Sequence, residues 1–302
     1  MSTTLAARIR STATCRGVSL GDAPENVGEL RESNDIMNSA EKLRSRMQED
    51  GYLLLRGLLD RDDVLDARRE VMRRLAIMEP LDSGRVLMDV MNELAADNPP
   101  LAKVLYDGPM MRFFDVLLGE PAKHFDFTWF RSVRPGDKGA APHTDVIFMG
   151  REERDRLFTA WTPIGNVDLE QGGLVVLEGS NNHPGLRDGY SRTDVDSYCS
   201  NREDSRDWWN RRIEKAEEGQ IADDASQVRR ILGGRWLTTE YSAGDVLVFS
   251  VFTVHGSLDN HSDRIRLSSD SRYQPASKPA DSRWIGANPI GHGPEAKRAL
   301  IC

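Results

Sequence analysis

Gly244-Asp-Val-Leu-Val-Phe-Ser-Val-Phe-Thr-Val254 is the most hydrophobic stretch of the chain, and it decides the fold. Its β-branched and aromatic residues predict a buried strand over 245–254. The stretch is followed at once by His255 and Gly256. The pattern therefore predicts an imidazole at the end of a buried strand, where it is placed to ligate a metal ion.

Short segments of the same kind, separated by Gly, Pro, Asp and Asn, fill the chain around this stretch. We expect strands over 125–133, 145–149, 158–163, 174–177 and 264–273. The earlier part of the chain has apolar residues at helical spacing instead. It predicts helices over 39–50, 60–78 and 101–118, with a short strand over 51–57. Helices first and many strands afterwards predict a mostly β fold, with a sandwich or barrel core and flanking helices.

The chain of 302 residues contains no internal repeat, and we expect a single main domain over 39–302. Residues 1–38 are predicted to form an N-terminal arm, either flexible or docked. Because Arg8, Arg10 and Arg16 precede the first acidic residue, an organellar transit peptide is the alternative. A polar insertion over 183–237, which contains Trp208 and Trp209, is predicted to be lid-like.

Composition excludes several classes of partner. A net charge of -8 with interleaved acids and bases gives no broad basic face for nucleic acid. No run of 18 apolar residues is present to cross a membrane. The three cysteines are widely spaced and lack a CxxC pair, which indicates neither a disulfide framework nor a structural zinc site, and favours a cytoplasmic location. A small-molecule substrate is the expected partner, and self-association into a homo-oligomer is left open.

Pro142-His143-Thr144-Asp145 is the sharpest local motif. If it lies at the edge of a strand, residues i and i+2 share a face, so the imidazole and the carboxylate converge. An HxD pair alone is weak evidence, because short patterns recur by chance. His255 adds a second imidazole. Two histidines and one carboxylate leave three positions of a metal open, as in non-haem Fe(II) oxygenases.

Arginines follow this motif at a spacing that suits an anionic cosubstrate. Arg266 lies eleven residues after His255, and its planar guanidinium is suited to grip a carboxylate with two hydrogen bonds. Ser257 could add a hydroxyl from the same face as His255. Arg264 and Arg272 lie in the same neighbourhood, and the sequence does not decide among the three arginines.

The chain resembles the phytanoyl-CoA dioxygenase (PhyH) family of Fe(II)/2-oxoglutarate oxygenases over roughly 40–284. The segments that carry the resemblance, in family order, are EDGYLLLRGLLDRDDV, PHTD, WTPIGNVDLEQGGLVVLEGSNNHPG and GDVLVFSVFTVHGSLDNHSDRIRLSSDSRYQP. The resemblance implies a double-stranded β-helix (jelly-roll, cupin-like) core. It assigns metal ligation to His143, Asp145 and His255, and cosubstrate contacts to Arg266, Ser257 and Trp161, with Thr128 and Arg131 as looser candidates.

The resemblance also implies the cofactors Fe(II), 2-oxoglutarate and O₂, and oxidation of a substrate C–H bond with succinate and CO₂ as co-products. Related halogenases replace the ligand carboxylate by a small residue, whereas this chain retains Asp145. Hydroxylation is therefore favoured, with desaturation, ring formation and epimerisation as other outcomes of the same oxidation. The rival interpretations are a non-catalytic metal-binding jelly-roll protein and a zinc-dependent hydrolase.

Overall fold

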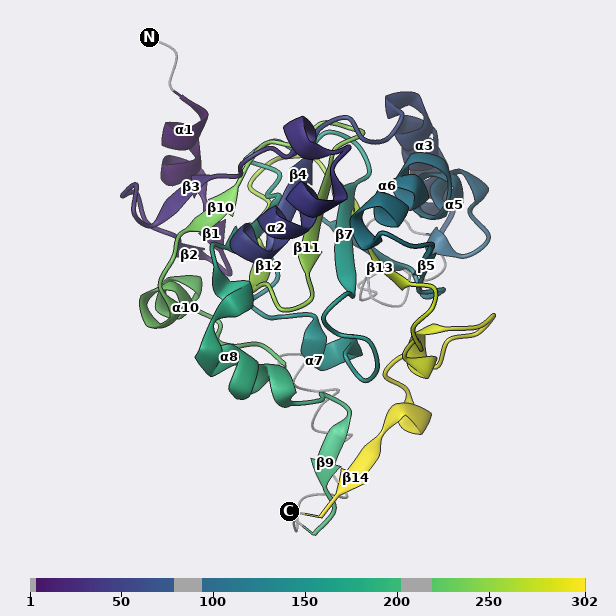
Figure 1. Cartoon of the computed structure of the whole chain (residues 1–302). Coiled ribbons are helices and arrows are strands. Elements are labelled where there is room, and N and C mark those ends of the chain that lie inside the picture. Colours follow the sequence, from purple (N-terminus) through teal and green to yellow (C-terminus); the bar gives the residue numbers. More distant parts are fainter. Residues whose placement is uncertain (1–3, 79–93, 202–218, 302) are drawn as a thin grey trace.

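Two facing sheets form the centre of the protein in a computed structural model, which describes residues 4–78, 94–201 and 219–301 (Figure 1). The larger sheet has the order β4-β11-β7-β13-β5, with β6 also paired to β13, and the smaller has the order β12-β8-β10-β3. The larger sheet comprises β4 (Tyr52–Leu55), β5 (Ala122–His124), β6 (Trp129–Val133), β7 (Phe158–Pro163), β11 (Val246–Ser250) and β13 (Arg266–Pro275). The smaller comprises β3 (Val27–Glu29), β8 (Leu174–Leu177), β10 (Trp236–Thr238) and β12 (His255–Ser257).

Apolar side chains from both sheets meet in one buried cluster. Leu54, Trp161 and Leu247 enter it from the larger sheet, and Val176 and Leu237 enter it from the smaller one. Removing this apolar area from water is what holds the sheets face to face. The expected mostly β architecture is confirmed.

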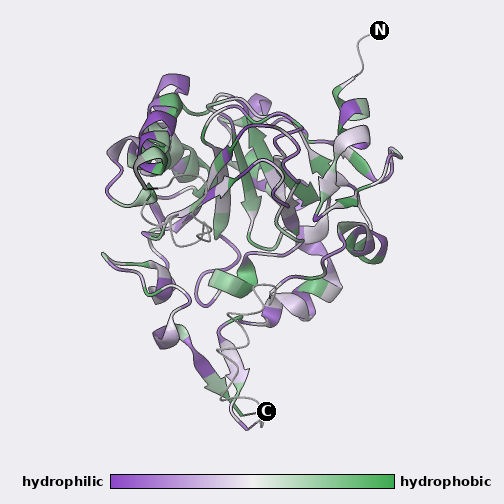
Figure 2. Ribbon diagram, turned by 180° about the vertical axis from the view of Figure 1, so that it is seen from behind, coloured by the Kyte–Doolittle hydropathy of each residue, from purple (hydrophilic) through white to green (hydrophobic). Residues whose placement is uncertain are grey.

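Four helices cover the outer face of the larger sheet: α2 (Ala40–Asp50), α3 (Arg61–Met78), α5 (Pro99–Tyr106) and α6 (Gly108–Leu118) (Figure 1). Both faces of β4 and β11 are therefore buried, so these two strands are apolar without alternation. Figure 2 shows the hydrophobic residues concentrated in the strands, while hydrophilic residues lie on the outer sides of these helices.

Two helices, α5 and α6, replace the single helix expected over 101–118, so the prediction of one continuous helix was wrong. Asp107 has an extended backbone and its side chain accepts a hydrogen bond from the amide of Gly108, the first residue of α6. Pro109 has no amide hydrogen to continue a helix from α5. The chain therefore turns at Asp107 and begins a second helix.

Two predicted strands around the metal-ligand motif also differ. Residues 145–149 form no strand: Asp145 has a helical backbone and begins the single turn α7 (Val146–Met149). The strand predicted over 245–254 ends at Ser250, and His255 begins β12 of the opposite sheet. A short apolar run fits a strand, a buried helical turn or a crossover between sheets equally well, so periodicity could not separate them.

The N-terminal segment packs against its own chain. It contains α1 (Leu5–Thr12), β1 (Thr14–Cys15), β2 (Val18–Ser19) and β3, and β3 pairs in parallel with β10. Ile9, Cys15 and Val27 are buried in one cluster with Val228 and Trp236. Residues 27–29 thus complete the smaller sheet.

The segment over 183–237 contains α8 (Pro184–Asp188), η3 (Tyr190–Arg192), β9 (Ser197–Cys199), α10 (Ala225–Leu232) and β10, while Trp208 and Trp209 lie outside the described residues. β9 pairs in parallel with β14 (Arg298–Leu300) near the C-terminus. Contrary to the expectation of no disulfides, Cys199 is disulfide-bonded, whereas Cys15 is free and buried. None of the described helices combines the length and apolar character needed to cross a bilayer.

Docking of the N-terminal segment should contribute measurably to the free energy of unfolding. Ile9 is fully buried, so Ile9→Ala should lower the free energy of unfolding by about 2–4 kcal/mol through lost burial and a cavity. Ile231→Ala, at a side chain that is 70% exposed, is the matched control and should change it by less than about 0.5 kcal/mol. Denaturant unfolding measures both. Equal, negligible effects would show that the segment does not pack on the domain.

Candidate metal centre

His143, Asp145 and His255 converge at one point. The Nε2 atoms of His143 and His255 lie 3.9 and 3.7 Å from Oδ1 of Asp145, and one potential ligand atom from each residue falls within 4.8 Å of the others. Among the described residues this is the only group of three His, Cys, Asp or Glu side chains arranged to hold a metal ion. The sequence motif and the distant histidine are therefore brought together as expected.

A two-residue backbone bridge holds the histidines beside each other. The amide of His143 donates to the carbonyl of His255, and the amide of His255 donates to that of His143, both at 3.0 Å. The approach is close enough to require glycine on both sides. A side chain at Gly139 would clash with the carbonyl of Ser257, and a Cβ at Gly256 would lie 2.7 Å from the carbonyl oxygen of Ala140.

Both imidazoles are oriented through their Nδ1 atoms. Nδ1 of His143 lies 2.7 Å from the carbonyl oxygen of Ala141, and Nδ1 of His255 lies 3.0 Å from that of Thr253. Donation from Nδ1 to a carbonyl leaves the lone pair on Nε2, the atom that faces Asp145. Burial and the neighbouring His255 lower the pKa of His143 to about 4, so it is neutral and able to ligate at neutral pH.

The two oxygens of Asp145 have different environments. Oδ2 accepts hydrogen bonds from Nη2 of Arg272 at 2.9 Å and from Oγ1 of Thr159 at 2.5 Å, whereas Oδ1 faces the histidines. Burial opposes ionisation, but the charge of Arg272 and the two imidazoles outweigh it and hold the pKa of Asp145 well below its ordinary value. An ionised carboxylate with one oxygen free completes a donor set of two nitrogens and one oxygen, which fits Fe(II) with three positions open.

The structure distinguishes the three arginines that the sequence left open. Arg264 is exposed and paired with Asp168, and Arg272 is committed to Asp145. Arg266 is 2% exposed, and its Nε and Nη1 atoms have no hydrogen-bond partner in the described part of the chain. Burial lowers the pKa of Arg266 to about 10. A buried, unsatisfied guanidinium is costly alone and is stabilised by a carboxylate ligand.

The other predicted cosubstrate contacts differ in what they offer. Trp161 is fully buried, its ring centre lies 6.0 Å from Cζ of Arg266, and its Nε1 has no partner among the described residues. Ser257 is buried and accepts a hydrogen bond from the amide of Ala140. The Thr128 hydroxyl is hydrogen-bonded to that of Tyr106, and Arg131 is paired with Asp270. Thr128 and Arg131 thus have protein partners already, unlike Arg266.

Thr159 and Asp270 are part of this site and were not found from the sequence, and the role of Arg272 was not recognised. In the antiparallel register Arg272 lies opposite Thr159, so both donors reach the same carboxylate oxygen. The alternation of β13 places residues 266, 268, 270 and 272 on one face, which was the available signal. To use this signal, one must know the register of β13 against β7 and not only that β13 is a strand.

The profile of the family described as phytanoyl-CoA dioxygenase (PhyH) matches residues 47–268. The chain belongs to this family. The PhyH match includes the three converging side chains and Arg266. Because PhyH proteins are Fe(II)/2-oxoglutarate-dependent oxygenases, the predicted enzyme class and the expected cofactors, iron, 2-oxoglutarate and O₂, are confirmed.

Individual relatives agree with the PhyH assignment. Two proteins named 1-deoxypentalenic acid 11-beta-hydroxylase, from Streptomyces exfoliatus and Streptomyces arenae, are each 26% identical to this chain, covering 80% of it and 83% of their own length. The structure resembles EctD from S. alaskensis, with a TM-score of 0.58, 16% identity and coverage of 89% of this chain and 88% of that one. It also resembles the epimerase SnoN from nogalamycin biosynthesis, with a TM-score of 0.56, 19% identity and coverage of 83% and 92%. The expected double-stranded β-helix fold is confirmed.

Arg272 should control metal affinity without touching the metal. Arg272→Met removes the cation that keeps Asp145 ionised and oriented, and loss of such a supporting contact typically weakens metal binding about 10–100-fold. Arg264→Met removes an exposed arginine from the same strand region and should leave affinity unchanged. Competition between the protein and a chelator for Fe(II) or Co(II) measures both. Equal affinity in the two variants would show that Arg272 has no part in the site.

Proposed function

We propose that His143, Asp145 and His255 ligate Fe(II), that Arg266 binds the distal carboxylate of 2-oxoglutarate, and that the enzyme hydroxylates a C–H bond of a small organic substrate. The observation that carries the proposal is the buried guanidinium of Arg266 beside Trp161, whose Nε and Nη1 atoms have no hydrogen-bond partner among the described residues. A non-catalytic metal site or a zinc hydrolase leaves that buried cation without a purpose.

Different residues around this site orient the histidines and the carboxylate. Iron and 2-oxoglutarate supply the oxidation of the C–H bond by O₂ when they are bound. The carbonyls of Ala141 and Thr253 fix the ring orientation of the two histidines, and Arg272 and Thr159 fix the carboxylate. The protein thereby holds the donor atoms in one geometry.

Around Arg266 the site excludes water. Trp161 is fully buried beside the guanidinium, and Ser257 is buried on the strand that begins with His255. In such a dry environment an ion pair between Arg266 and a carboxylate is much stronger than in water. The inferred cosubstrate contacts are therefore Arg266, Trp161 and Ser257, with Thr128 and Arg131 as more distant supports.

Hydroxylation of a specialised metabolite is the outcome that we favour. Asp145 occupies the position that a halogenase leaves small, and the two relatives at 26% identity are named as hydroxylases of 1-deoxypentalenic acid. Aromatic side chains lie on one side of the triad. Phe148 lies edge-on to His143 with ring centres 5.8 Å apart, and the rings of Trp129 and Trp284, 4.7 Å apart, belong to the same cluster as Phe148. Such a surface suits an apolar carbon skeleton.

The segment over 183–237 acts as a lid over the site. The lid and the site belong to a single catalytic domain over 39–302. The amide of Ile221 donates to the carbonyl of Pro142 at 2.8 Å, and that of Val195 donates to Ile147 at 3.1 Å, so the segment is attached on both sides of Asp145. A lid in this position would select the substrate. The cytoplasmic location stays a prediction, and the disulfide at Cys199 does not support the cysteine argument for it.

Cosubstrate binding tests the role of Arg266. Iron-loaded protein should bind 2-oxoglutarate and release succinate slowly without substrate, and Arg266→Ala should weaken binding by about 100-fold, because a charge-assisted bidentate contact in a dry site is lost. Arg264→Ala is the matched control and should behave as the wild type. Calorimetric titration and a succinate assay measure the two effects. Undiminished binding by Arg266→Ala would exclude the assigned role.

The metal ligands are tested by substitution. His143→Ala or Asp145→Ala should reduce succinate release to background, because each removes one of three donor atoms, whereas His261→Ala outside the cluster should not. Circular dichroism verifies that the variants fold. A fully active variant would remove that residue from the metal site, and a succinate-release screen over a metabolite panel would identify the substrate.

A further inference from the structure

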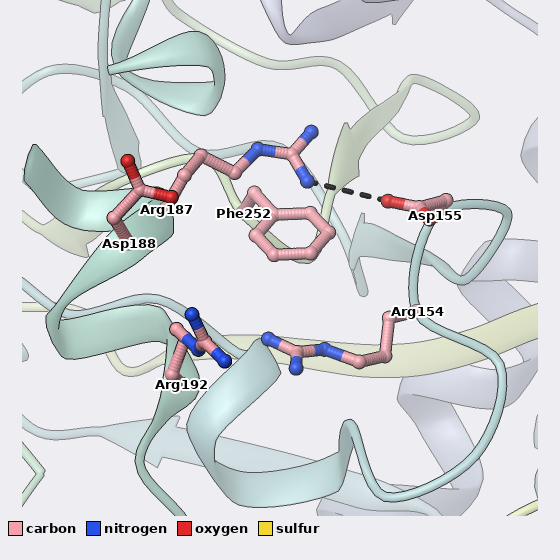
Figure 3. A pocket seen from close by; sticks show the side chains of 6 residues that line it. All are labelled: Arg154, Asp155, Arg187, Asp188, Arg192 and Phe252. Atoms are coloured by element: carbon pink, nitrogen blue, oxygen red, sulfur yellow. Dashed lines mark hydrogen bonds and ion pairs between the residues drawn. The ribbon is translucent and has the colours of Figure 1, made fainter. Parts of the chain in front are cut away.

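A pocket of about 270 Å³ is lined by residues other than the predicted metal and cosubstrate residues. It opens where the loop after α7, the helices α8 and η3 and the turn over 251–254 meet (Figure 3). The residues that line it are Arg154, Asp155, Arg187, Asp188, Arg192 and Phe252. None of the three metal-ligand candidates nor Arg266 is among them, so the pocket is a separate feature.

The charges in this pocket do not balance. Nη1 of Arg187 pairs with Oδ1 of Asp155 at 3.2 Å, the ion pair drawn in Figure 3. Asp188 makes no ion pair with the three arginines in the described ranges, and Arg192 has no side-chain hydrogen bond or ion pair there. Nη2 of Arg154 donates to the carbonyl of Ser191, while its Nε is buried without a partner in the described part of the chain. Among the described residues, Arg154 and Arg192 therefore make no ion pair, although the carboxylate of Asp188 lies in the same lining.

These two groups face each other. In Figure 3 the guanidinium of Arg154 extends toward that of Arg192 beneath the Phe252 ring. Burial and the charges of Arg187 and Arg192, partly opposed by Asp155, lower the pKa of Arg154. Arg154 is half-buried and Arg192 is exposed, so water screens their repulsion only in part, and an anion between the two guanidinium groups would relieve the rest.

Phe252 fixes the arginines from within the pocket. Cζ of Arg187 lies 3.6 Å from the centre of its ring and Cζ of Arg154 lies 5.3 Å from it, in the range of cation–π contacts. Nε of Arg187 also donates to the carbonyl of Asn181 at 2.9 Å. The donors are therefore held in place before a ligand arrives, which reduces the entropy lost on binding.

We propose that Arg154, Arg187 and Arg192 bind the phosphate or sulfate group of a small molecule at a site separate from the metal centre. Three arginines against two aspartates leave the lining with one excess positive charge, and a tetrahedral oxyanion offers acceptors to both the Arg154 and the Arg192 guanidinium groups. The volume lies near the lower limit for small-molecule pockets, which fits a compact phosphorylated or sulfated compound. Asp155 and Asp188 at the rim disfavour larger polyanions such as nucleic acid.

Such a ligand would join two parts of the metal-site surroundings. Arg187 and Arg192 belong to the 183–237 segment, whereas Phe252 lies on the turn whose Thr253 carbonyl orients His255. Val251 on that turn accepts a hydrogen bond from the amide of Val146, the residue after Asp145. The bound anion would therefore fasten the lid segment to the turn that carries a metal ligand.

The test uses the full-length enzyme with iron and saturating 2-oxoglutarate, without O₂, titrated calorimetrically with inorganic phosphate, sulfate or acetate at constant ionic strength. Phosphate and sulfate should bind saturably with one site per chain, and acetate should bind at least about tenfold more weakly. Arg192→Gln should weaken phosphate binding by about tenfold, and Arg154→Gln/Arg192→Gln should abolish it. Arg69→Gln, which removes an exposed charge from α3, should bind as the wild type.

Thermal unfolding controls for damage to the fold. Arg192 has no side-chain partner among the described residues, so Arg192→Gln should unfold at the wild-type temperature without phosphate. Phosphate should then raise that temperature in the wild type and in Arg69→Gln, but much less in Arg192→Gln. The proposal is overturned if phosphate does not bind saturably, if Arg192→Gln binds it equally well, if acetate binds as tightly, or if 2-oxoglutarate displaces it.

Discussion

The pair of hydrogen bonds between the backbones of His143 and His255 is the contact on which the site depends. His255 begins a strand of the smaller sheet, and His143 lies in the loop that leads to Asp145. Their reciprocal bonds bring residues more than a hundred positions apart in sequence into register. The glycines at 139 and 256 permit this approach because neither position has room for a side chain. The candidate ligands His143 and His255 are thereby brought together by backbone contacts alone.

Charge in the centre of the sandwich is arranged in two different ways. Arg272 and Asp145 neutralise each other within the protein, so the carboxylate stays ionised despite its burial. Arg266 has no such partner for its Nε and Nη1 atoms among the described residues. The same strand, β13, therefore carries one arginine that is paired with a carboxylate of the protein and another whose Nε and Nη1 atoms are unpaired among the described residues. Alternation along a single strand accounts for both.

Local chemistry was predictable from the sequence, and its spatial context was not. β7 and β8 have the predicted limits, because strand-forming residues and turn residues bound them sharply. The 145–149 run became a helical turn and 251–254 became a crossover, since short buried apolar runs carry no periodicity that separates these outcomes. The choice of Arg266 over Arg264 and Arg272 needed their partners, which depend on strand register and on the loop carrying Asp168.

The pairing of Arg272 with Asp145 also affects what the site would become if the carboxylate were lost in evolution. Removing Asp145 alone would vacate a coordination position and leave a buried guanidinium beside it without its counter-ion. The simplest way to restore neutrality is for an inorganic anion to enter the gap and reach the metal. A single substitution at Asp145 would thus create both the space and the electrostatic attraction for an exogenous ligand.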